Sequence, residues 1–175
     1  MLKFCSACGQ PVQFRIPADD QRLRAVCTVC GTVHYENPRL VVGCVPLWQG
    51  RILLCRRAIE PRRGFWTVPA GFHEIGETVK HAAARETREE AMAEVEIGSL
   101  LAVVEVLHAA QVHLFFRAQM RTAAHGIGAE SLEVALCEPS AIPWPEIAFP
   151  SVTFALQQHL KEPPGGGAGV HYLTV

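Results

Sequence analysis

Two cysteine pairs near the start of the chain restrict its fold more than any other feature. Cys5 and Cys8 form "CSACG", Cys27 and Cys30 form "CTVCG", and eighteen residues separate the pairs. A CxxC turn lets two thiolates reach one ion, and the glycine after it lets the backbone curl around the sulfurs. Two such turns at this spacing predict a structural four-thiolate Zn²⁺ site. Two disulfides or a thioredoxin-like CxxC are the alternatives, but the first suits secreted proteins and the second needs only one pair.

The segment between the pairs indicates a small β domain over residues 1–37. "QPVQFRIPADDQRLRAV" contains two short alternating runs around an "ADD" turn, which is typical of a zinc-ribbon hairpin. Residues 1–40 contain five Lys or Arg and three Asp or Glu, too small an excess for a surface that follows phosphates. A nucleic-acid partner is therefore not expected. The ribbon is instead a candidate contact surface for a homodimer, or a lid over a neighbouring site.

The whole chain has the size and composition of one domain with a small satellite. It has 175 residues, 49% of them apolar, and a net charge of −1, so a sizeable core is available and no general attraction to anionic partners is expected. No apolar run approaches the roughly 18 residues that span a bilayer. "MLKFCSACGQ" lacks the apolar stretch of a signal peptide. We expect a protein without membrane partners in a reducing, cytoplasmic compartment.

After a short "YENPRL" linker, the pattern predicts an α/β domain over residues 38–162. "LVVGCVPLW" and "RILLCRR" flank a "QG" turn signal and predict a hairpin. A helix is expected from an N-cap at Thr78 to about Glu90, and a second from an N-cap at Ser151 to about Lys161. Further strands are expected at 100–107, 112–120 and 132–137, with His113 at the surface near a turn. Residues 163–175 are expected to form a flexible Gly/Pro-rich tail, whose "VHYLTV" could add an edge strand or contact a partner.

The first predicted helix carries an unusual group of charges near its end. Steps of three and four place Glu86, Glu89 and Glu90 on one face, which is apolar at its start. Carboxylates near a helix C-terminus oppose the macrodipole, so a compensating charge is expected. Mg²⁺ or Mn²⁺ would supply it, since oxygen ligands suit both ions. A solvated face carrying Arg–Glu pairs with Arg85 and Arg88 is the alternative.

The spacing around these acids resembles the Nudix box, GX5EX7REUXEEXGU. Its matching positions here are Gly71, Glu77, Arg85, Glu86, Glu89 and Glu90. The resemblance implies an α/β/α sandwich around a mixed β-sheet and hydrolysis of a nucleoside diphosphate linked to another group. It also implies that Glu86, Glu89, Glu90 and the Gly71 carbonyl hold the catalytic metals. Glu77 would support that site, and Arg85 would hold it by an ion pair.

Two box positions differ from the family pattern. Met92 replaces the last glycine and Thr87 an aliphatic residue. A methionine in a left-handed conformation costs about 1–2 kcal/mol, so either the helix continues past Met92 or the turn is strained. Glu130 and Glu133, in "GAESLE", are candidates to approach the metals from the side, and Glu133 is kept as a catalytic candidate. A solvated loop is the alternative for that pair.

The zinc ribbon, "HYENP" and "AFPS" together resemble a zinc-ribbon subgroup of Nudix enzymes that act on FAD and ADP-ribose. This resemblance implies cleavage of such a substrate to AMP and a phosphorylated partner. NADH pyrophosphatases are the second enzyme class, although their "SQPWPFP" segment has no match after the box. A Nudix ligand sensor is the non-enzymatic alternative, but such a protein would be expected to lose box carboxylates. Aromatic side chains available to hold a ring are Phe65, Trp66, Phe72, Phe115 and Phe116, each also suited to the core.

Overall fold

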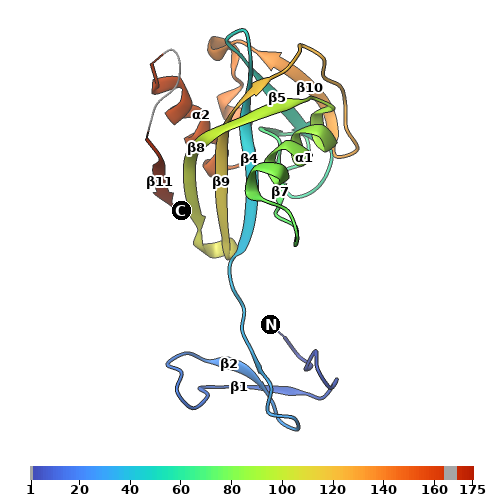
Figure 1. Ribbon diagram of the computed structural model, residues 1–175, viewed down its shortest axis with the longest axis vertical. Helices are drawn as coiled ribbons and strands as arrows, with labels where there is room; N and C mark the ends of the chain where they lie inside the picture. Colours follow the sequence, from blue (N-terminus) through green and yellow to red (C-terminus); the bar gives the residue numbers. More distant parts are fainter. Residues whose placement is uncertain (1, 164–168) are drawn as a thin grey trace. The chain divides into compact units, whose positions relative to one another are not determined.

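The computed structural model describes residues 2–163 and 169–175, which form two compact units, Met1–Asn37 and Pro38–Val175. The first unit is a three-stranded antiparallel sheet in the order β1-β2-β3. Its strands are β1 (Val12–Arg15), β2 (Arg24–Cys27) and β3 (Val33–His34). The first two strands pair from Val12 with Cys27 to Arg15 with Arg24, which confirms the predicted hairpin (Figure 1).

The second unit is built on one mixed sheet in the order β10-β5-β4-β9-β8-β11, with β6 beside β5 and β7 beside β4. Its strands are β4 (Arg39–Trp48), β5 (Arg51–Arg57), β6 (Trp66–Thr67), β7 (Ala70–Phe72), β8 (Val95–Val106), β9 (Gln111–Met120), β10 (Ser131–Cys137) and β11 (His171–Thr174). Two pairs are parallel, β4 with β9 and β11 with β8, and the other neighbours are antiparallel.

The turn between β4 and β5 shows why its two residues predict a hairpin. Gln49 and Gly50 both have positive φ, 49° and 81°. A two-residue turn with positive φ at both positions matches the twist of antiparallel strands, and glycine adopts that conformation without steric cost. The register then places Leu47 opposite Ile52. The predicted hairpin is confirmed.

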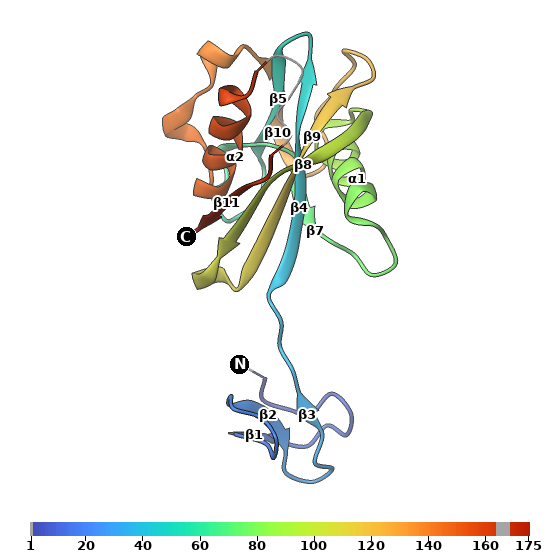
Figure 2. The ribbon, with the colours of Figure 1, turned by 60° about the vertical axis from the view of Figure 1, so that its left-hand side comes forward.

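Two helices cover opposite faces of this sheet, as Figure 2 shows. The helix α1 (Val79–Ala91) packs Ala82, Ala83 and Ala91 into one buried cluster, and α2 (Pro150–Lys161) packs Val152 and Leu156 into another. Short 3-10 helices lie at Leu107–Ala109, Pro139–Ala141 and Trp144–Glu146. The small side chains of α1 let its backbone approach the sheet closely. The two buried layers confirm the predicted sandwich with a mixed sheet.

The start of α2 corrects two expectations. Its N-cap is Phe149, and no side chain caps it. Ser151 is 1% exposed and its Oγ is hydrogen-bonded to Nδ1 of His113 at 3.0 Å. His113 is buried as well, and its Nε2 lies 2.9 Å from Oε1 of Gln111. Ser151 therefore forms a hydrogen bond with a buried histidine of β9 and does not cap the helix. The prediction that His113 lies at the surface was wrong.

The end of the chain adds a strand to the sheet. β11 pairs in parallel with β8, from His171 opposite Ala102 to Thr174 opposite Glu105. Thr174 also donates a hydrogen bond to the Glu105 carboxylate at 2.7 Å. The edge-strand alternative for "VHYLTV" is the one observed. The flexible tail was predicted partly over residues 164–168, which lie outside the described residues.

Candidate functional site

The site begins where the chain enters α1. Thr78 has extended backbone angles and its Oγ1 accepts a hydrogen bond from the backbone N–H of His81, at 3.2 Å. This N-cap was predicted from the sequence, and it satisfies one of the free N–H groups of the first turn. Glu77 precedes the cap and accepts a bond from the backbone N–H of Glu74 at 2.9 Å. The loop and the helix start are thus fixed by short-range bonds.

Arg85 connects the loop to the acidic face of the helix. Its Nε and Nη2 donate to the two oxygens of Glu77, at 3.1 and 2.7 Å. Its Nη1 donates to Glu86 at 2.7 Å and to Glu89 at 3.0 Å. Its Nη2 also reaches the carbonyl of Phe72 at 3.1 Å. This ion pair lowers the pKa of Glu77 to about 2, and a planar guanidinium is the side chain suited to such a fork.

Glu86 and Glu90 are buried beside this network, at 8% and 7% exposure. Burial raises the pKa of Glu90 to about 8, and the charge of Glu86 adds to the rise. Burial also raises the pKa of Glu86, against the opposing effect of Arg85. Among the described residues, Oε2 of Glu90 is a buried oxygen without a hydrogen-bond partner. A buried carboxylate without enough positive charge is expected to bind a cation or take up a proton.

Gly71 lies against the carboxylate of Glu86. A Cβ atom at Gly71 would collide with the carboxylate of Glu86, so no larger residue fits without movement. The backbone N–H of the preceding residue, Ala70, is hydrogen-bonded to Glu90. The β7 backbone therefore lies directly against the two buried acids, which is the placement that a carbonyl ligand would need.

The C-terminus of α1 explains how a methionine replaces the box glycine. Met92 has φ 49° and ψ 29°, a left-handed conformation, and its N–H donates to the carbonyl of Arg88 at 2.9 Å. The helix therefore ends here in a strained turn, the second of the two alternatives. The side chain of Met92 is 63% exposed and its sulfur lies beside Gly126. The left-handed conformation of Met92 costs stability, but the replacement of glycine by methionine leaves all the acidic side chains of the box in place.

A loop closes over this helix end, and we call residues 126–131 the capping loop. The N–H groups of Gly126 and Gly128 donate to the carbonyls of Ala91 and Glu90, at 2.8 and 3.1 Å. Ser131 Oγ donates to the same Glu90 carbonyl at 2.8 Å. A Cβ on Gly128 would overlap the carbonyl of Glu89. The loop satisfies carbonyls that a helix end leaves free, and glycine allows its close approach.

Thr87, the other unusual box residue, is fully buried on the helix face that meets the sheet. Its hydroxyl donates to the Ala83 carbonyl at 2.8 Å and lies 3.2 Å from the thiol of Cys44. Burial raises the pKa of Cys44 to about 12, so the thiol stays protonated and donates to the threonine oxygen. The polar side chain is thus satisfied inside the core.

The two acids of the "GAESLE" segment take different positions. Glu130 belongs to the capping loop, which is bonded to the end of α1 through the N–H of Gly128 and Oγ of Ser131, both donating to the Glu90 carbonyl. Glu133 is exposed on β10 and pairs with Arg56 at 3.5 Å. The pairing of β10 with β5 has a register shift between Ser131 and Glu133. Both acids were candidates from the sequence, and Glu133, the one kept as a catalytic residue, stays a prediction.

The aromatic candidates differ in how far their side chains are exposed. Phe115 and Phe116 are buried in the core, at 1% and 4% exposure. Phe72 is 44% exposed, and its ring lies 5.0 Å from the guanidinium of Arg39. Phe65 is half-buried and lines an open pocket, and Trp66 is half-buried against the core on the α2 side of the sheet.

The acidic site and the cysteine cluster differ in how closely their ligand atoms gather. Among the described residues, the four thiols are a group whose ligand atoms all lie within 4.8 Å of one another. The helix carboxylates do not meet that limit as a set, and Arg85 lies between two of them. They still fit a divalent cation, since Glu90 has a buried unpartnered oxygen and carboxylate donors suit such ions.

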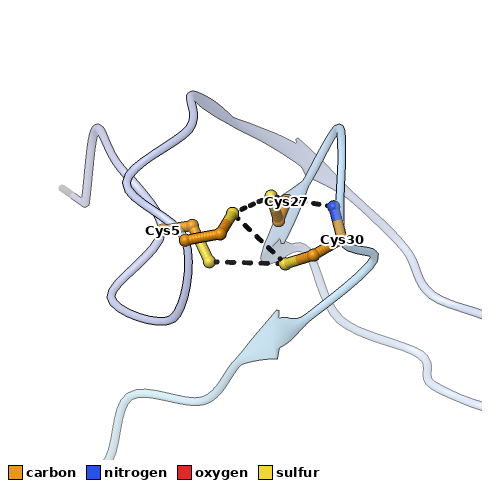
Figure 3. Close-up of side chains that lie close together, drawn as sticks. Cys5, Cys27 and Cys30 are labelled. Atoms are coloured by element: carbon orange, nitrogen blue, oxygen red, sulfur yellow. Dashed lines mark hydrogen bonds between the residues drawn. The ribbon is translucent and has the colours of Figure 1, made fainter.

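The cysteine cluster has the dimensions of a tetrahedral site. Figure 3 shows Cys5, Cys27 and Cys30 converging between two loops. The Cys8 sulfur lies 3.4 Å from those of Cys27 and Cys30, and the Cys5 and Cys30 sulfurs are 3.7 Å apart. Zinc bound at about 2.3 Å requires sulfur separations of about 3.8 Å. These cysteines are free thiols, so the geometry favours zinc over disulfides. His34 Nε2 supports the Cys5 sulfur at 3.3 Å.

Two family models match the chain in sequence. The NUDIX domain model matches residues 37–152, and the Nudix N-terminal zinc-ribbon model matches residues 3–36. The first covers strands β4 to β10 of the sheet, α1 and the acidic site. Among the described residues, no helix has both the length and the apolar character that crossing a membrane requires.

Known structures and curated proteins give a consistent comparison. A crystal structure of a NUDIX hydrolase from Nitrosomonas europaea is 46% identical, covers 99% of both chains and has a TM-score of 0.95. A NAD-capped RNA hydrolase NudC from Vibrio vulnificus is 36% identical over 54% of this chain and 34% of its own length. The mouse mitochondrial NAD(P)H pyrophosphatase NUDT13 is 29% identical over 89% of this chain and 41% of its own. The chain therefore spans only about a third to two fifths of these curated relatives.

Proposed function

Because this chain belongs to the Nudix family, we propose that it is a divalent-metal-dependent pyrophosphohydrolase acting on a nucleoside diphosphate linked to another group. The observation that carries the proposal is the acidic site of α1. Two buried carboxylates with raised pKa lie against the Gly71 backbone, and one of their oxygens has no partner among the described residues. A purely structural helix face would not be expected to bury Glu86 and Glu90 this way.

The residues of the chain take distinct roles in this reaction. Glu86, Glu89 and Glu90 would hold Mg²⁺ or Mn²⁺ together with the Gly71 carbonyl. Bound divalent ions neutralise a pyrophosphate, polarise its phosphorus and lower the pKa of a coordinated water.

Other residues orient this metal site and could take up a proton. Arg85 orients two of the carboxylates and is itself fixed by Glu77. Glu130 is the candidate to accept the proton of the attacking water, because its loop is bonded to the helix end that carries Glu90 and its side chain is exposed to solvent. Glu133 stays a predicted catalytic residue without a contact to this group.

The zinc ribbon is proposed to be structural. Four thiolates complete the coordination of Zn²⁺ and leave no position for substrate. Its apolar side chains Phe4, Leu23 and Val29 are 60%, 65% and 70% exposed, which is compatible with the predicted homodimer contact. Sedimentation of the intact protein at several concentrations would test that contact.

FAD or ADP-ribose remains the proposed substrate class, with AMP as one product. The zinc-ribbon, "HYENP" and "AFPS" segments support it, and a fold neighbour from Streptococcus suis is titled an ADP-ribose pyrophosphatase, at 17% identity. NAD(H) is the second candidate, favoured by the names of the curated relatives that act on NAD-capped RNA or NAD(P)H. All three share an adenosine diphosphate group, which is the common element of the proposal.

The test is chromatography of products after incubation with FAD, ADP-ribose and NADH in parallel, with Mg²⁺ and with Mn²⁺. AMP and an equal amount of FMN, ribose 5-phosphate or reduced nicotinamide mononucleotide, respectively, would establish cleavage between the phosphates. Each reaction should stop when the divalent metal is left out. If all three substrates stay intact under both metals, the hydrolase proposal is wrong and the ligand-sensor alternative replaces it.

A further inference from the structure

An open pocket of about 590 Å³ lies on the α2 side of the sheet, away from the acidic face of α1. The segment before β6, the first turns of α2 and β11 contribute to it. Its lining includes Arg62, Phe65, Ile147, Pro150, Phe154 and Gln157. Ligand pockets of this size are mostly apolar and carry a few polar groups that orient the ligand, and this lining has that composition.

The charges of the pocket select for an anionic ligand. Its lining includes the cation Arg62 and no acidic residue. The guanidinium of Arg62 lies 5.3 Å from the centre of the Phe65 ring. Arg62 itself is exposed. A guanidinium and a phenyl ring held together form a surface on which a planar ring can stack, as they do when proteins bind bases.

Gln157 adds a directional group at the rim of the pocket. It is exposed on α2, and within residues 2–163 and 169–175 its side-chain amide makes no hydrogen bond. A glutamine amide offers one donor and one acceptor side by side, which matches the amino group and ring nitrogen at one edge of adenine. Thr153 is less available, because its hydroxyl already donates to the Phe149 carbonyl at 3.4 Å.

A short segment connects this pocket to the acidic site. At one end the N–H of Ala58 donates to the Glu130 carbonyl at 2.8 Å. Next to it, Arg57 pairs with Ser131, whose Oγ donates to the Glu90 carbonyl, and the Arg57 guanidinium lies 5.1 Å from the Phe149 ring. At the other end, Phe65 lines the pocket. Residues 57–65 thus connect the loop bonded to the acidic site with the pocket, and Arg57 stands at the end nearer the acidic site.

We propose that this pocket binds the adenine ring of an adenosine phosphate, stacked on Phe65 and Arg62 and read at its edge by Gln157. The choice of the substrate's AMP half as occupant rests on the proposed function. The phosphate would then extend toward Arg57 and the acidic site. This assignment accounts for an arginine–aromatic pair in a pocket that has no acidic lining.

The test is calorimetric titration of the intact zinc-loaded protein with AMP and with ribose 5-phosphate, without Mg²⁺ or Mn²⁺ so that binding of the phosphate to metal at the acidic site does not add to the measured affinity. AMP is expected to bind and ribose 5-phosphate, which lacks the ring, to bind at least about tenfold more weakly. Phe65→Leu, which keeps an apolar side chain without the ring, should weaken AMP binding about tenfold. Gln157→Ala should weaken AMP binding about fivefold and leave ribose 5-phosphate unchanged.

Arg63→Ala is the matched control for Arg62→Ala, because both remove one exposed arginine from the same loop and only Arg62 lines the pocket. Equal losses of AMP affinity in these two variants would overturn the proposal, since a general charge effect would explain both. Equal binding of AMP and ribose 5-phosphate, or unchanged AMP binding in Phe65→Leu, would overturn it too. AMP binding that depends on Phe65 in a protein without turnover would support the pocket while refuting the hydrolase.

Discussion

The cysteine cluster and the acidic site of α1 both bring several anionic ligand groups together, but they differ in how these groups are arranged and neutralised. In the ribbon, four sulfurs lie 3.4–3.7 Å apart where measured, and backbone N–H groups of Ala7 and Val29 point at them. In α1, the carboxylates spread apart and Arg85 neutralises two of them. A closed cluster completes one ion and is fixed, whereas an open one keeps room for ions and a substrate. This difference is the one expected between a structural zinc site and a catalytic site for divalent ions, as proposed here for the two clusters.

Removal of zinc is expected to have the largest effect, and it tests whether the cysteine cluster is a structural metal site. Cys27→Ser should lose bound zinc and expose residues 1–37 to proteases, because zinc binding contributes about 10–16 kcal/mol to folding such small domains. Residues 38–175 should keep their fold. Elemental analysis and limited proteolysis measure both effects. Cys137→Ser is the control, since Cys137 lies alone on β10, and a protease-resistant ribbon in Cys27→Ser would refute the assignment.

Glu90→Gln should reduce turnover about a thousandfold or more while leaving the fold intact. The change keeps the shape of the side chain and removes the anionic oxygen that faces no partner among the described residues. The measurement is kcat for the substrate found by product chromatography, with circular dichroism as the fold check. Glu94→Gln is the matched control, because Glu94 pairs with Arg88 outside the site. Turnover within tenfold of the parent would contradict a catalytic metal at Glu90.

Glu130→Gln should slow turnover about a hundredfold, the typical scale for loss of a general base, and Glu133→Gln by much less. The first belongs to the loop that is bonded to the Glu90 carbonyl, while the second pairs with Arg56. The pH profile of kcat/KM should lose its acidic limb in Glu130→Gln alone. A greater loss of turnover in Glu133→Gln than in Glu130→Gln would instead support Glu133 as the catalytic residue.

Without added Mg²⁺ or Mn²⁺, the free energy of unfolding should fall as pH rises from about 4.5 to about 8. The folded state raises the pKa of Glu90 to about 8, so across this interval it binds more protons than the unfolded chain. Urea unfolding followed by tryptophan fluorescence reports this unit, since Trp48, Trp66 and Trp144 all belong to it. Glu90→Gln should flatten the dependence, and an unchanged slope in that variant would show that other groups cause it.

Met92→Gly should have the smallest effect, a gain of about 1 kcal/mol or less with activity retained. Glycine removes the left-handed strain of about 1–2 kcal/mol, and its greater freedom in the unfolded chain offsets part of the gain. Thermal unfolding and kcat of the variant test this. A large activity loss would show that the contact between Met92 and Gly126 has a role of its own.

Local features of the fold could be predicted from the sequence because short-range physics determines them. The Gln49–Gly50 turn and the Thr78 cap depend on neighbouring residues alone. Ser151 looks equally like a cap, but its partner is His113, 38 residues away and on another element. Contacts at that distance require the tertiary structure, so local propensity gave the wrong partner.

The same limit applies to the acidic site. The fixed gaps of the box identify Glu77, Arg85 and the helix carboxylates, since helical periodicity places them together. The position of Glu130 depends on a loop whose Gly128 and Ser131 bond the Glu90 carbonyl, about 40 residues away along the chain, which no alternation of residues reveals. The Arg62–Phe65 pocket is likewise assembled from three distant segments, so sequence could suggest Phe65 only as one of several aromatics.

The capping loop also makes two backbone amides reporters of local opening. The N–H groups of Gly126 and Gly128 are bonded to carbonyls of the helix end that carries Glu90, so their protons can exchange with solvent only when the loop lifts away. Hydrogen exchange at these two glycines therefore measures the free energy of separating Glu130 from the buried acids. A cation held by both segments would slow that exchange in proportion to its affinity, so the occupancy of the site can be followed with no turnover at all.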